Sequence, residues 1–214
     1  MRATPFAPIL LICLAGMSAC GDTSTPLAVT WLEWSDSVTA GVPFRVRTSG
    51  LMTDHPTSLR IYVTVARDTI TIMPFSAEPP CRGVCAGAPG PYDTLVRIPA
   101  IRTTTSRTVV VRAPSDLHRL DPPFPPRTFG TITVSVATPV APHMHSVGMA
   151  SGAGDAAGCY YVRPLSSAPL YISADQSPAW APGFIGFVYG RTDPVLRSAC
   201  RDGAYVIQLD SIIQ

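Results

Sequence analysis

The sequence predicts an all-β protein, and three observations lead to this fold class. Apolar and polar residues alternate with a period of two in most regular runs, most cleanly over residues 59–66 and 131–136, which is the pattern of strands with one buried face. No window of ten or more residues carries a helical stripe of apolar positions. The 23 prolines are scattered along the chain and argue against long helices.

The N-terminal segment predicts export. Arg2 precedes an apolar run over residues 6–15, which has the length of a signal-peptide core and is too short to span a bilayer. The run is followed by Met17-Ser18-Ala19-Cys20, which resembles the lipobox of bacterial lipoproteins. The resemblance implies that residues 1–19 are a signal peptide and that the Cys20 thiol carries a diacylglyceryl anchor. An ordinary secretory signal cut near the same point is the alternative, and it would also export the chain.

Location and partners follow from the anchor and the charge. The lipobox resemblance implies a lipoprotein of the bacterial cell envelope, bound to the membrane through its lipid and facing the periplasm or the cell surface. Without Arg2, 15 Arg and 14 acidic residues remain, so there is no basic field that would attract nucleic acid. We therefore expect an envelope protein or a glycan as partner, and no nucleic acid.

Four cysteines remain in the exported part of the chain, and an even number in an oxidising compartment predicts disulfides. Of the three possible pairings we favour Cys81–Cys85 and Cys159–Cys200, because each joins cysteines within one candidate domain. The second bridge would close a loop of about 40 residues, which the loop-entropy model values at roughly 4 kcal/mol. Two Cys-x-x-Cys knuckles, as a four-cysteine zinc site would need, do not occur.

The first candidate domain follows a short polar tether over residues 20–26. Residues 27–139 contain seven or eight β-rich runs, separated by turn clusters at the spacing of a β-sandwich. Within them, residues 36–46 resemble the first strands of bacterial immunoglobulin-like modules, in which a Gly turn leads into an amphipathic strand. This resemblance implies an Ig-like β-sandwich, whose proline-rich loops over residues 79–91 and 121–126 are the usual place for a binding surface.

Two tryptophans lie near the first strand of this region. Trp31 and Trp34 are three residues apart, so their side chains should point to opposite faces of the strand. We expect one of them in the core and the other exposed.

Residues 140–157 are rich in Ala, Gly, Ser and Pro and have little apolar periodicity. Such a composition is typical of a linker or a mobile loop. We place the domain boundary there.

Residues 158–214 contain four or five further strand-like runs with tight turns. Asp202-Gly203 is a strong hairpin signal, and Gly186 inside a strand indicates curvature or a bulge. The succession resembles the small five-stranded barrel of OB type, which implies a wall that can bind oligosaccharides or nucleic acid. Continuation of one large sandwich is the alternative.

Candidate chemistry is sparse. His143-Met144-His145 has copper-ligand character, with an inert linker as the alternative interpretation. No Gly-x-Ser-x-Gly elbow, dinucleotide fingerprint or calcium loop is present. The sequence therefore favours a non-enzymatic binding or scaffolding protein without a cofactor. The alternatives are a copper-handling protein or a hydrolase whose site depends on long-range contacts.

Overall fold

The computed structural model describes residues 25–52, 59–76, 90–115, 124–140, 142–154, 158–165, 168–173, 176, 183–198, 200 and 204–213, without the side chains of residues 25 and 193–197. Every regular element in these ranges is a strand, which confirms the all-β prediction. None of the described residues forms a helix with the length and apolarity needed to cross a bilayer. The strands are β1 (Thr25–Pro26), β2 (Val29–Ser35), β3 (Ser37–Thr39), β4 (Phe44–Met52), β5 (Leu59–Ala66), β6 (Thr69–Ser76), β7 (Gly90–Ile98), β8 (Arg107–Pro114), β9 (Pro126–Ser135), β10 (Met144–Gly154), β11 (Tyr160–Pro164), β12 (Leu170–Ile172), β13 (Ile185–Arg197) and β14 (Tyr205–Ile213).

The smaller of two sheets has six strands. Its order is β1-β6-β8-β9-β3, and β5 joins it by pairing with β6. The β5–β6 hairpin turns through Arg67, whose φ of 44° is left-handed. Two of the pairings, β6 with β8 and β3 with β9, are parallel.

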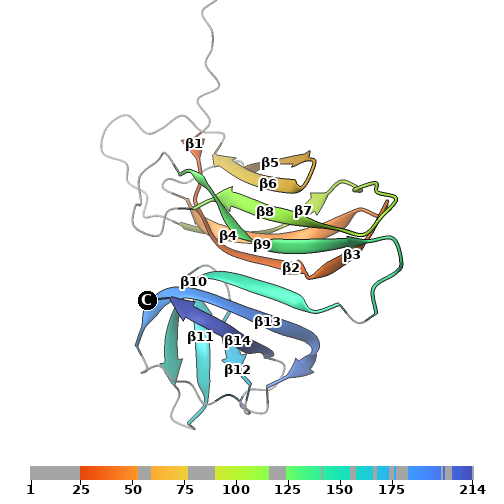
Figure 1. Cartoon of the computed structure of the whole chain (residues 1–214). Helices are drawn as coiled ribbons and strands as arrows, with labels where there is room; N and C mark the ends of the chain where they lie inside the picture. Colours follow the sequence, from red (N-terminus) through yellow and green to blue (C-terminus); the bar gives the residue numbers. More distant parts are fainter. Residues whose placement is uncertain are drawn as a thin grey trace, which may run out of the picture.

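The larger sheet has eight strands and curls into a barrel at one end. Its order is β11-β12-β14-β13-β10-β2-β4-β7, and β11 also pairs with β10. That additional pairing closes β10, β11, β12, β14 and β13 into a five-stranded barrel, whereas β2, β4 and β7 stay in an open layer. Figure 1 shows the barrel below the two-layered part of the molecule.

The molecule has two hydrophobic cores. One lies between the two sheets and contains Leu32, Trp34 and Ile132. The other fills the barrel and contains Trp31, Val188 and Ile207. Trp31 and Trp34 do point to opposite faces of β2, but both are buried, at 0% and 1% exposure. The expectation that one would be exposed is wrong, because the barrel interior covers the outer face of β2.

Strand β10 replaces the linker predicted over residues 140–157. It pairs with β2 through residues 144–148, with β13 through residues 144–151 and with β11 through residues 150–154. Its glycine, alanine and serine residues hide the strand in the sequence, because the barrel-facing positions 146, 148, 150 and 152 are buried and carry only small residues. The five-stranded barrel predicted for residues 158–214 is confirmed, but its first strand begins at Met144.

The two sheets pack face to face across the first core, but the Ig-like topology is not confirmed. Immunoglobulin sandwiches consist of two antiparallel sheets, whereas β6 and β8 run parallel here. The predicted tether over residues 20–26 ends in β1, which pairs with the end of β6.

The Cys159–Cys200 disulfide is confirmed. The two Cα atoms are 6.0 Å apart, and the bridge closes a sequence separation of 41 residues. It links the segment before β11 to the segment after β13. Cys81 and Cys85 lie outside the described residues.

Candidate functional site

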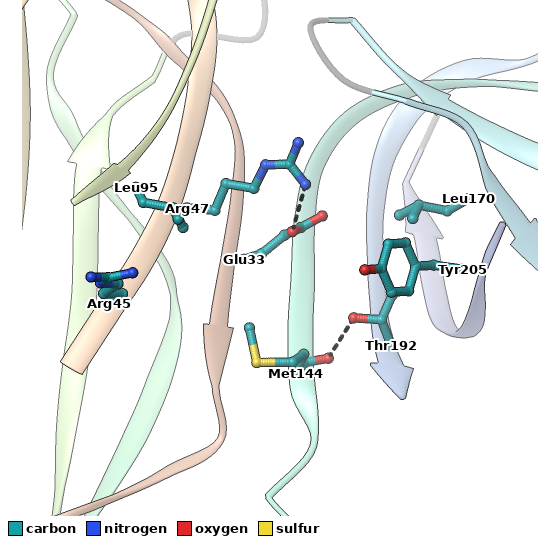
Figure 2. Close-up of a pocket in the computed structure, with 8 residues that line it drawn as sticks. All are labelled: Glu33, Arg45, Arg47, Leu95, Met144, Leu170, Thr192 and Tyr205. Carbon is teal, nitrogen blue, oxygen red and sulfur yellow. Dashed lines mark hydrogen bonds and ion pairs between the residues drawn. The ribbon is translucent and has the colours of Figure 1, made fainter. Parts of the chain in front are cut away.

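A cavity of about 320 Å³ opens at one end of the barrel, and we call it the barrel mouth. Met144 on β10 and Glu33 on β2 lie on the strand faces that continue into the barrel interior, because Trp31 two residues before Glu33 belongs to the barrel core. The barrel mouth is therefore the open end of the barrel interior, a common place for ligand sites in β-barrels. Its lining residues, drawn in Figure 2, are Glu33, Arg45, Arg47, Leu95, Met144, Leu170, Thr192 and Tyr205.

The walls of the barrel mouth are mainly apolar. Leu170 and Tyr205 come from the barrel strands β12 and β14, and Leu95 lies across the cavity on β7. Leu95 is 59% exposed and Tyr205 is 47% exposed. Single exposed apolar side chains are ordinary, but two that border one cavity form a surface that an apolar ligand can cover.

A cluster of ion-paired side chains lies in the middle of the cavity. The Arg47 guanidinium donates to both oxygens of Asp93, at 2.8 and 2.6 Å, and to Oε2 of Glu33 at 3.5 Å. The Trp31 indole N–H donates to the other Glu33 oxygen at 3.0 Å. The hydrogen bonds to Asp93, together with the attraction of Glu33, hold the pKa of Arg47 above its ordinary value. The single positive charge of Arg47 is thus shared by two carboxylates, and the cluster keeps one net negative charge.

Arg45 differs from Arg47 in its surroundings. It borders the cavity, is exposed, and stands directly opposite Arg97 in the β4–β7 register. Neither Arg45 nor Arg97 forms an ion pair with another described residue. Like charges directly opposite each other across two strands are unfavourable. One side of the barrel mouth therefore carries an excess of positive charge.

Buried hydroxyl groups lie beneath the cavity. The Ser146 and Thr192 hydroxyl oxygens are 3.3 Å apart and hydrogen-bonded to each other. Thr192 also borders the cavity. The Thr192 hydroxyl also donates to the Met144 carbonyl at 3.5 Å. The two hydroxyls therefore add a neutral polar patch to the floor rather than a nucleophile beside a base.

The three candidate copper ligands are not brought together. His145 packs on Trp34 with ring centroids 5.5 Å apart, on the side of the first core, and burial lowers its pKa. Met144 borders the cavity on the opposite side of the sheet, since neighbouring residues of a strand alternate. His143 is exposed just before the strand. Among the described residues, no group of three or more His, Cys, Asp or Glu could hold a metal ion.

Of the residues that line the barrel mouth, sequence reasoning singled out only Met144, and it did so as a candidate copper ligand. Arg45 and Arg47 were visible only as the polar positions of an amphipathic strand, and their neighbours across the sheet depend on register. The predicted lipidation site, Cys20, lies outside the described residues. On the barrel strands β11 and β12, Tyr161 and Tyr171 pack on each other with ring centroids 5.5 Å apart.

Comparisons with known proteins give no relative to guide the interpretation. No protein-family model, no curated protein and no solved structure matches this chain.

Proposed function

We propose that this chain is a non-enzymatic binding protein of the bacterial cell envelope, held at the membrane by a lipid on Cys20, and that it binds a small apolar ligand in the barrel mouth. The observation that carries the proposal is the cavity itself. Its volume, about 320 Å³, lies at the lower end of the range for small-molecule sites, and its walls are mostly apolar with a few polar groups, as such sites usually are.

The polar groups at the barrel mouth favour binding over catalysis. Glu33 accepts hydrogen bonds from Arg47 and Trp31, so both of its carboxylate oxygens are occupied. The Ser146 hydroxyl is bonded to a second hydroxyl, and His145, the nearest described imidazole on the same strand, belongs to the other face of β10. A hydrolase would need a nucleophile within reach of a base, and no observation on the described residues favours that alternative.

We also propose that the barrel is of OB type. Its strands close in the order β10-β11-β12-β14-β13, and β12 pairs parallel with β14. A five-stranded barrel in which the last two strands exchange their order agrees with the Greek-key connection of that family. OB-type barrels bind their ligands on one wall. The site proposed here lies at the open end of the barrel instead.

Binding can be tested with a neutral, environment-sensitive naphthylamine dye. We expect its fluorescence to rise when it binds the folded protein, and Leu95→Asp to weaken binding because a charge would enter the apolar wall. Ile185→Asp is the matched control, since Ile185 is 66% exposed on β13 and does not border the cavity. Equal dye binding by both variants would contradict the proposed site.

The anchor is tested separately. Cys20→Ala should release the protein from the membrane fraction and abolish labelling by a fatty-acid analogue. A variant that still carries the label would show that the lipid is not on Cys20.

A further inference from the structure

The positive side of the barrel mouth indicates the charge of its ligand. Arg47, Arg107 and Arg191 each contact a carboxylate within the described part of the chain. Arg45 and Arg97 contact none there, although they face each other across β4 and β7. An anion placed between the two guanidinium groups would relieve their repulsion and accept charge-assisted hydrogen bonds from both.

The rest of the ligand has to be apolar and short. In Figure 2, Arg45 and Leu95 lie on one side of the cavity and Tyr205 on the other. The Arg47–Glu33 pair stands between the two sides, and the way past it runs along Met144. A volume of about 320 Å³ holds roughly ten groups of the size of a water molecule or a methylene, at about 30 Å³ each. Glu33 and Asp93 share the single positive charge of Arg47, so the middle of the cavity keeps a net negative charge. This charge would repel a second anionic group, so the ligand carries its charge at one end only.

The backbone around the cavity argues against a peptide. β4 is paired with β7 along its whole length and with β2 through residues 47–50, and β2 is paired with β10 through residues 31–35. An extended peptide therefore finds little free strand edge along the floor. Among the lining strands β7 has a free edge, but this edge faces away from the cavity because β4 lies between β7 and the floor. Peptide amides in the cavity would lose their hydrogen bonds to water without replacement.

We infer that the barrel mouth binds an aliphatic carboxylate of about ten carbons. The carboxylate lies at the rim between Arg45, which borders the cavity, and Arg97, which stands opposite it on β7 outside the lining. The chain starts beside Leu95 and runs along Met144 toward Tyr205. This inference rests on the proposed function and specifies the ligand class of the same site.

The experiment compares decanoate with decanol on the folded, disulfide-bonded protein by equilibrium dialysis of labelled ligand. We expect decanoate to bind more tightly than decanol, and octanoate to bind about tenfold more weakly than decanoate because two methylenes are missing. Arg45→Gln should raise the Kd of decanoate about tenfold and change that of decanol much less. Arg60→Gln, an exposed arginine on β5, is the matched control and should change neither value.

The outcomes separate the ligand class inferred here from the proposed binding site. Equal affinity for decanoate and decanol, or an unchanged Kd for decanoate in Arg45→Gln, overturns the carboxylate while binding of the neutral dye keeps the proposed function. Failure of decanoate to bind overturns the inference, and failure of the dye as well overturns the site. Tighter binding of an apolar peptide with a free C-terminus than of decanoate assigns the site to peptides. Arg45→Lys, which retains the charge, should lose less affinity than Arg45→Gln, and circular dichroism checks that every variant is folded.

Discussion

Replacement of Gly148 by alanine should destabilise the whole protein. A Cβ atom at this position would lie 2.7 Å from the Cα of Trp31 and even closer to the carbonyl oxygen of Thr30. Both obstacles are backbone atoms of β2, the partner of β10 at this point, so no side-chain rotation can relieve the clash. The φ of Gly148, +157°, is also one that other residues rarely adopt.

The expected loss follows from the clash. Overpacking a well-filled interior costs about 1–3 kcal/mol, and in a protein of about 200 residues each kcal/mol lowers Tm by roughly 2–4 °C. We therefore expect Gly148→Ala to lower Tm by about 2–12 °C in a non-reducing thermal melt followed by circular dichroism. The matched control on the same strand is Gly154→Ala, whose Cβ would meet its nearest atoms, in the ring of Tyr160, at an ordinary 3.5 Å. Equal melting of the two variants would refute the argument that β10 and β2 are in close contact at Gly148.

Three further predictions concern β10 and the barrel. Limited proteolysis of the folded, oxidised protein should leave residues 144–154 uncut, because a strand paired on both sides is a poor substrate; early cleavage there, seen by mass spectrometry, would favour a linker. Cys200→Ser should lower the free energy of unfolding by about 4 kcal/mol in urea titrations, and an unchanged midpoint would mean that the bridge with Cys159 does not constrain the unfolded chain. Burial lowers the pKa of His145 below 6.5, so the unfolded chain binds the proton more readily and stability should fall as the pH decreases below about 6.5. His145→Gln should flatten this pH dependence, and an identical slope in both proteins would exclude His145 as its source.

Much of the fold could be predicted from the alternation of apolar and polar residues along the strands. Strands β5 and β9 follow the period of two because one face of each is more buried than the other, and the Cys159–Cys200 bridge followed from the grouping of the cysteines. Strand β10 was missed because small residues line its most crowded face. Ala150 is fully buried and Gly148 touches the backbone of β2, so neither position shows the apolar side chain by which a buried strand is usually recognised.

The candidate site was out of reach for a different reason. Arg45 meets Arg97 and Arg47 meets Glu33 through the registers of two strand pairs, and no local pattern encodes such registers. Leu170 and Tyr205 reach the same cavity only because the sheet curls until β12 and β14 stand opposite β4 and β7. Sequence reasoning finds the charged face of each strand. It does not find which other strand lies opposite that face.

The pairing of β10 with β2 on one edge and with β13 on the other also has a consequence for folding during synthesis. Until the residues after 143 have been synthesised, β2 has an unpaired edge along residues 31–35. The indole of Trp31, which belongs to the barrel core, is then exposed as well. An open, apolar strand edge is a template for association with other chains. A truncated protein that ends before Met144 should therefore aggregate rather than fold as an independent sandwich, and the barrel protects the N-terminal half of its own chain from self-association.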